Sequence, residues 1–180
     1  MKDKPIHVSS IENNIEELKK YLKDGEDIDV LGEYDCTPLH YACREGNLKI
    51  VKFLLENDSK LNKKNRYSTL YPIFDALTSH NEKTLFSILE LLLDNGADIN
   101  NSDSFGNTLL HYAVEKENED LIELFIAVGC DINQTFRHDK DTPLHYACFQ
   151  KNEKLISTLI KNGADRDVIN LYNKTPESYL

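Results

Sequence analysis

The sequence predicts an all-α solenoid of stacked helix-turn-helix units joined by short hairpin-like loops. The first observation is a repeated phrase: "CTPLHYACREGN" at residues 36–47 returns as "DTPLHYACFQKN" at residues 141–152. His40 and His145 are 105 positions apart, which equals three steps of 35. The second observation is that apolar residues after each phrase recur at helical spacing, as in "LKIVKFLL" and "LISTLI". A period of this length is typical of a repeat array.

Weaker copies of the phrase set the register of the array. They begin at residues 4, 37, 71, 108, 142 and 175, with steps of 33, 34, 37, 34 and 33 residues. A second series, "DGEDID", "NDSKLN", "DNGADIN", "VGCDIN" and "NGADRD", keeps the same intervals. We therefore expect a single domain, residues 1–180, with repeats at about 4–36, 37–70, 71–107, 108–141 and 142–174 and a capping half-repeat at 175–180.

Each unit is predicted to contain two helices. Thr followed by Pro favours a helix start, because the hydroxyl can cap free N–H groups and Pro suits the first turn. The short first helix is expected to end at Gly46, or at Asn118 and Asn152 in the same slot, with a positive φ. The longer second helix ends at a glycine in four units, and Asp58 fills that slot in the remaining one. Asp58 is therefore predicted to have a positive φ.

Two units depart from the pattern. The third has Phe74 in place of His and about four extra residues near 78–84, which should lengthen the connection between its helices. The first has Ser9 and Ser10 where other units have Ala with Cys or Val, and its second helix is strongly charged. We expect this unit to be a terminal cap with a polar outer face.

Two short helices cannot bury their own apolar faces, whereas stacked copies can. The pattern of "TPLH", the small pair after it and "GADIN" resembles the ankyrin repeat from about residue 4 to the end of the sequence. The resemblance implies a non-enzymatic module for protein–protein interaction, with a concave recognition surface and no cofactor.

Four histidines occupy equivalent positions: His7, His40, His111 and His145. A metal ladder or a set of general bases would be the functional interpretation. Packed helices lie roughly 8–10 Å apart, whereas zinc ligands lie about 2 Å from one ion. We therefore predict that these histidines are structural, bonded to the Thr hydroxyl and to loop backbone, and that the protein holds no metal.

The remaining chemistry-bearing residues give no catalytic pattern. The four cysteines form no C-x-x-C pair and are expected to be free, mostly buried thiols. The sequence has no phosphate loop, nucleophile elbow or H-E-x-x-H motif. It therefore predicts no enzyme activity and no catalytic residue.

Charge and hydropathy narrow the class of partner. A net charge of -10 disfavours nucleic acid and anionic membranes, because phosphate rewards clustered Lys and Arg. The apolar runs are too short to span a bilayer, and the amino terminus lacks the apolar core of a signal peptide. We expect a cytoplasmic protein that is monomeric on its own and binds a protein partner.

The resemblance places the binding surface on loop tips and on the exposed, concave inner face of the first helices. Carried onto this sequence, the tips supply Tyr34, Tyr67, Phe105, His138 and Tyr172, and Arg66 is expected on the same side. The first helices supply Arg44, Glu45, Glu115, Lys116, Phe149 and Gln150. Tyr and Phe are favoured interface anchors, and Arg is enriched at interfaces. The alternative is that each ring packs along its own loop.

Two other functions stay open at this point. The chain could act as a bacterial effector or a viral host-interaction factor, since small ankyrin proteins occur in both classes, and such a role would place it in a host cell. Alternatively, it is a regulatory subunit that controls an enzyme or ligand site, with residues 78–84 as a lid or metal-sensing loop.

Overall fold

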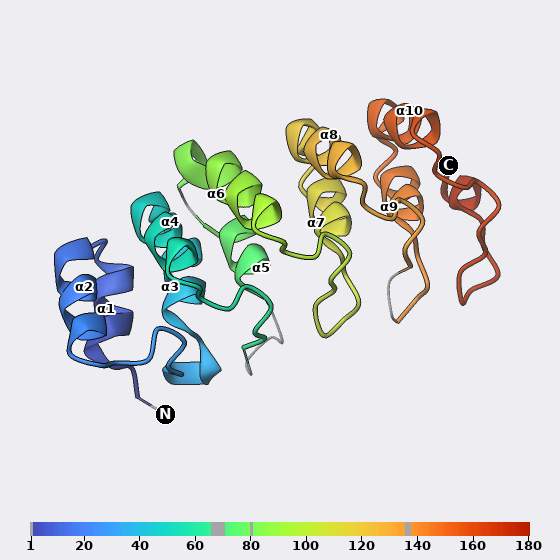
Figure 1. Ribbon diagram of the computed structural model, residues 1–180. Helices are drawn as coiled ribbons and strands as arrows, with labels where there is room; N and C mark the ends of the chain where they lie inside the picture. Colours follow the sequence, from blue (N-terminus) through green and yellow to red (C-terminus); the bar gives the residue numbers. More distant parts are fainter. Residues whose placement is uncertain (1, 66–70, 80, 136–137) are drawn as a thin grey trace. The chain divides into compact units, whose positions relative to one another are not determined.

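The computed structural model describes residues 2–65, 71–79, 81–135 and 138–180 (Figure 1). Within these ranges the chain is helical, and its β-structure is limited to one isolated bridge between Ser102 and Thr108. The predicted all-α class is therefore confirmed. The chain divides into two compact units, residues 1–98 and residues 99–180, which are considered separately.

The described residues of the first unit form three helix pairs and one short 3-10 turn. Its elements are α1 (Pro5–Ile11), α2 (Ile15–Lys23), η1 (Glu33–Asp35), α3 (Pro38–Arg44), α4 (Leu48–Glu56), α5 (Pro72–Leu77) and α6 (Glu82–Asp94). Figure 1 shows the first helices of the pairs, α1, α3 and α5, in one row and the second helices in another. Leu39, Ile50 and Leu54 between them are fully buried. Burial of such side chains stabilises a fold by about 1.5–3 kcal/mol each.

In the second unit, the part of the chain outside residues 136–137 forms two helix pairs and a terminal 3-10 turn. Its elements are α7 (Leu109–Glu115), α8 (Glu119–Val128), α9 (Pro143–Phe149), α10 (Glu153–Lys161) and η2 (Pro176–Tyr179). η2 packs against α9, as the predicted half-repeat should. The five predicted helix pairs and the half-unit are thus all present.

The Thr-Pro phrase starts the first helices as expected. Thr142 is the N-cap of α9, and its hydroxyl accepts from the backbone N–H of His145 at 3.4 Å. Pro143 follows at the first helical position, where its missing N–H costs no hydrogen bond. Thr108 caps α7 in the same way without a Pro.

The second helices end at residues with positive φ. Gly25, Gly96, Gly129 and Gly163 have φ between 92° and 96°, and Asp58 has φ 62°. The prediction for Asp58 is confirmed. The slot requires a left-handed residue whichever side chain occupies it.

The prediction for Asn118 and Asn152 was wrong by one residue. The positive φ values belong to Glu117 and Lys151, at 52° and 56°. Asn118 and Asn152 instead cap the next helices, where each side-chain oxygen accepts an N–H at 3.1–3.2 Å. Asn suits both roles, so its presence alone did not decide between them.

The extra residues of the third repeat lengthen a helix more than a connection. Residues 78–81 join α5 to α6, whereas residues 45–47 join α3 to α4. α6 has 13 residues, against nine in α4. The expected long connection was wrong, because most of the added length continues the helical hydrogen bonding of α6.

The two serines of the first repeat are not part of a polar outer face. Ser9 and Ser10 are both fully buried. Their hydroxyls donate to the carbonyls of Pro5 and Ile6, at 3.0 and 2.9 Å. That expectation was wrong for the serines, because a backbone hydrogen bond satisfies each hydroxyl inside the core.

The loops are closed by hairpin-like backbone bonds. The N–H groups of Gly32, Asp103 and Asn170 each donate to the carbonyl four residues later, at 2.9–3.0 Å. Each bond closes the base of a loop and leaves its tip exposed. Among the described helices, none combines the length and apolar character needed to cross a bilayer.

Candidate interaction surfaces

The repeated histidines lie inside the fold. His145 is 1% exposed, and its Nδ1 accepts the backbone N–H of Thr142 at 3.1 Å. Its Nε2 therefore carries the proton and donates to the carbonyl of Lys174, 3.1 Å away. His111 bonds Asp141 in the same way, and His7 bonds Val30. His40 has the same contacts to its Thr through Nδ1.

Burial also keeps His111 out of acid–base chemistry near neutral pH. Desolvation lowers the pKa of His111 to about 4, so the ring is neutral near pH 7. The described residues contain no group of three His, Cys, Asp or Glu side chains that could hold a metal. The described contacts of His7, His111 and His145 are hydrogen bonds that hold the neighbouring loops to the helices.

The thiols are all free and poorly reactive. Burial raises the pKa of Cys43 well above its usual value, and it raises the pKa of Cys130 to about 11. The thiolate is the nucleophilic form, so neither side chain is activated near neutral pH.

The loop tips present aromatic side chains to solvent. Tyr34, Phe105 and Tyr172 are 50%, 55% and 64% exposed. Two of these tips are held by the same device: the side chain two residues earlier, Asp103 or Asn170, accepts the tip N–H at 2.8–2.9 Å. The backbone of each of these two tips is thus fixed while its ring stays largely exposed.

The tip residues make few contacts with one another. The rings of Phe105 and His138, from consecutive loops, lie 6.0 Å apart between centroids. Arg66 and Tyr67 lie outside the described residues. Among the described tip residues the structure therefore brings together Phe105 and His138, whereas Tyr34 and Tyr172 are exposed on their own loops.

The first-helix positions are of two kinds. Glu45, Lys116 and Phe149 are exposed, and Phe149 reaches 70% exposure. Arg44 is instead half-buried, with its Nη2 2.6 Å from Oδ1 of Asp75 on α5. A residue predicted to face a partner is thus already paired inside the first unit.

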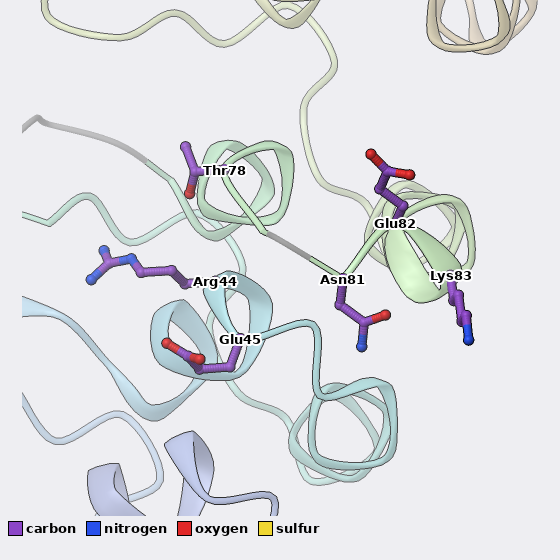
Figure 2. A pocket seen from close by; sticks show the side chains of 6 residues that line it. All are labelled: Arg44, Glu45, Thr78, Asn81, Glu82 and Lys83. Atoms are coloured by element: carbon purple, nitrogen blue, oxygen red, sulfur yellow. The ribbon is translucent and has the colours of Figure 1, made fainter.

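A hollow of about 770 Å³ lies beside Arg44 in the first unit. It is lined by Arg44, Glu45, Thr78, Asn81, Glu82 and Lys83. Figure 2 shows Arg44 and Lys83 pointing away from each other, and Glu82 pointing away from the side chain of Asn81. Because these charged groups do not converge, the described residues that line the hollow form no cluster of the kind that catalysis requires.

The inserted segment beside this hollow is attached to the preceding repeat. Thr84 donates its hydroxyl to the carbonyl of Gly46 at 2.8 Å, and Asn81 contacts the same carbonyl. A Cβ on Gly46 would lie 2.6 Å from Cβ of Asn81. Close packing on a glycine therefore fixes the described part of the segment.

The second unit contains a pocket that the sequence analysis did not predict. We call it the tyrosine pocket; its volume is about 240 Å³, and it is lined by Asp139, Asp141, His145, Tyr146, Phe149, Tyr172 and Tyr179. Only Phe149 and Tyr172 of its rings were predicted surface residues. A signal existed, because Tyr146 and Tyr179 take the same position after Thr-Pro in "TPLHY" and "TPESY".

Comparison with known proteins agrees with the architecture. The family model described as "Ankyrin repeats (3 copies)" matches residues 1–65 and 76–170. An ankyrin repeat protein of Acanthamoeba polyphaga mimivirus is 32% identical over 109 residues, which are 61% of this chain and 14% of that protein.

Two chicken (Gallus gallus) proteins are similarly related. The nuclear factor NF-kappa-B p105 subunit is 32% identical over 143 residues, 77% of this chain and 14% of that protein. NF-kappa-B inhibitor alpha is 32% identical over 132 residues, 72% of this chain and 42% of that protein. The chain therefore spans less than half the length of each of these relatives. The family match and the repeated helix pairs together show that this chain belongs to the ankyrin repeat family.

Proposed function

We propose that the chain is a non-enzymatic module that binds a partner protein through its loop tips and the exposed ends of its first helices. Ankyrin repeats are protein-interaction modules. The observation that carries the proposal is the set of exposed rings at these positions, with Phe149 and Tyr172 the most exposed. The repeat framework does not require them, and exposed aromatic rings are a solubility liability unless a partner covers them.

The charge of the surface suits a protein more than a polyanion. The chain has a net charge of -10, and exposed cations such as Lys116 lie among acidic side chains. Patches of both signs set the orientation of a protein partner, whereas a phosphate backbone would be repelled. A cytoplasmic, monomeric module is the corresponding expectation.

Two narrower versions follow from the relatives. Similarity to ankyrin repeat proteins of mimivirus and of fowlpox virus supports a host-interaction role. Similarity to a protein named as an NF-kappa-B inhibitor supports a role in which binding regulates the partner.

The experiment is affinity capture from the native source with the tagged chain, followed by quantitative mass spectrometry. The matched bait carries Phe105→Ala and Phe149→Ala. A protein enriched by the parent bait and lost with the double variant would support the proposal. Equal capture by both baits would refute the assigned surface, and turnover of a small molecule by the purified chain would refute the non-enzymatic function.

A further inference from the structure

The tyrosine pocket joins aromatic rings to carboxylates. Tyr146 and Phe149 come from α9, Tyr179 comes from η2, and Tyr172 and the two aspartates come from the flanking loops. Phe149 and Tyr179 meet edge to face, with centroids 6.1 Å apart. The rings therefore form walls that a guest of a few atoms can contact, within a volume of about 240 Å³.

The walls of the pocket are held in place by hydrogen bonds. The backbone N–H of Leu171 donates to the carbonyl of Asp139 at 2.8 Å, which joins the two loops. Asn170 Nδ2 donates both to Asp141 Oδ1, at 2.6 Å, and to the hydroxyl of Tyr179, at 2.9 Å. The pocket is thus largely formed before any guest enters.

Both carboxylates keep an oxygen for a guest. Asp139 Oδ1 accepts the hydroxyl of Tyr172 at 3.2 Å, and Asp141 Oδ1 accepts Asn170. No hydrogen bond to either Oδ2 occurs among the described residues. Two negative charges with free acceptors therefore face the pocket.

The electrostatics favour a cation. Proximity to Asp139 raises the pKa of Tyr172, and burial together with Asp141 and Glu115 raises the pKa of Tyr146. The shift of Tyr172 reports negative potential at a wall of the pocket, whereas that of Tyr146 comes first from burial. Aromatic faces attract cations as well. The ring of Tyr179 already attracts a cation, because Nζ of Lys174 lies 4.8 Å from its centroid.

We propose that the tyrosine pocket binds the ammonium group of a lysine side chain on the partner protein. The inference rests on the proposed function, because it gives the partner a recognition element. The rings contact the aliphatic stem and the cation, and the free oxygens of Asp139 and Asp141 accept from the ammonium. A neutral side chain of the same shape gains the apolar contact alone.

The test uses small probes and the full chain with isotope-labelled Tyr and Phe rings, followed by NMR titration. N-acetyl-lysine methylamide should shift the ring signals of Tyr146, Phe149, Tyr172 and Tyr179. N-acetyl-norleucine methylamide, a neutral near-isostere, should bind about tenfold more weakly. Equal affinity for the two probes, or signals that do not move with the lysine probe, would overturn the assignment.

Variants separate the charge from the apolar walls. Asp139→Asn should lower the affinity for the lysine probe about three- to tenfold. Phe149→Leu, which preserves apolar bulk but removes the aromatic ring, should lower it by a similar factor. Asp120→Asn on α8 removes the same charge outside the pocket and should leave the affinity unchanged. If Asp120→Asn weakened the probe as much as Asp139→Asn, binding would reflect net charge only, and the pocket assignment would be wrong.

The probes do not depend on the partner. Failure of the lysine probe, with a partner still captured through Phe105 and Phe149, would remove the pocket assignment and leave the proposed function standing. Loss of partner capture with intact probe binding would remove the proposed function and leave the pocket as a site for a lysine ammonium group.

Discussion

Arg44 and Asp75 form an ion pair across two adjacent repeats of the first unit, with 2.6 Å between Nη2 and Oδ1. The side chain of Asp75 is 2% exposed and that of Arg44 is 39% exposed. The position of Asp75 in its repeat is held by Tyr41, Tyr112 and Tyr146 in other repeats. The buried carboxylate of Asp75 has no counterpart at those positions. Because it is buried, the stability of the packing between the second and third repeats depends on its ion pair with Arg44.

Arg44→Met should lower the free energy of unfolding by about 1–3 kcal/mol near pH 7.5, less than for a fully buried pair because the guanidinium is partly solvated. Burial raises the pKa of Asp75 to about 6 although Arg44 lowers it, and loss of Arg44 raises it further. Native Asp75 can then take up a proton at lower pH, so the loss should be smaller near pH 5.

Urea unfolding of the parent and the variant at both pH values measures these losses. Lys52→Met, which removes an exposed ion pair with Glu56, is the control and should change stability by less than about 0.5 kcal/mol. A loss from Arg44→Met that grows as the pH falls would contradict the assignment.

His111 should make the second unit less stable in mild acid. Its pKa is lowered to about 4 by burial, against roughly 6.5 in an unfolded chain. Between these values the unfolded chain binds a proton that the native state does not. The stability is therefore complete above about pH 6.5 and falls by up to about 3 kcal/mol as the pH approaches 4. Urea unfolding across this pH range, with the parent chain and the His111→Gln variant, measures the effect. If the free energy of unfolding had the same pH dependence in both proteins, the prediction would be wrong.

Lys151→Gly should stabilise the second unit. Lys151 has φ 56°, a conformation that costs an ordinary residue about 1 kcal/mol, and glycine removes that strain at a smaller entropic cost. We expect a gain of roughly 0.5 kcal/mol in chemical unfolding. The neighbouring change Asn152→Ala removes the cap of α10 and should cost about 1 kcal/mol. A loss from Lys151→Gly would contradict the strain assigned to that residue, and a gain from Asn152→Ala would contradict the observed cap.

Gly46→Ala should destabilise the first unit by more than about 2 kcal/mol. The new Cβ would meet Asn81 at 2.6 Å and Ser79 at 2.8 Å, in addition to the strain of φ 69°. Gly25→Ala is the matched control, because its Cβ would meet nothing within 4 Å and only the strain of φ 92° remains. The melting temperature of Gly46→Ala should therefore be well below that of Gly25→Ala. Equal losses of stability would mean that Ser79 and Asn81 shift without cost to accommodate the new Cβ.

The double substitution Phe105→Ala and Phe149→Ala should lower the affinity for the captured partner by more than about tenfold. Truncation of an interface hot spot typically costs 2 kcal/mol or more of binding free energy. The melting temperature should change little, since both rings are largely exposed. Lys52→Ala with Glu123→Ala, on second helices, is the control pair. Calorimetric titration would contradict the surface assignment if the control pair weakened binding more than the aromatic pair.

The sequence was sufficient for the helix pairs because the Thr-Pro phrase and the glycine slot repeat together. Asp58 followed from the same register. Asn118 was misplaced because asparagine suits both a left-handed position and a helix cap, and Glu117 gives no local signal for positive φ. The longer α6 was missed because a polar stretch such as "NEK" is compatible with either a loop or a first helical turn.

The interaction surface was less predictable than the fold. Exposure of Phe105 and Tyr172 followed from their place in the loops, since a tip has few neighbours. The pairing of Arg44 with Asp75 did not, because it joins residues 31 positions apart whose side chains meet only after the repeats stack. The tyrosine pocket was missed for the same reason: its walls come from α9, η2 and two loops, whose side chains meet only in the folded chain.

The buried bond from His145 to Lys174 has a consequence for how such a chain can change over time. It secures the base of a loop from inside, through a backbone carbonyl that every amino acid possesses. The residue at the tip, Tyr172, takes no part in that bond. Substitutions at the tip can therefore alter which molecule is recognised without any compensating change in the histidine, and binding specificity can diverge while the scaffold is inherited intact.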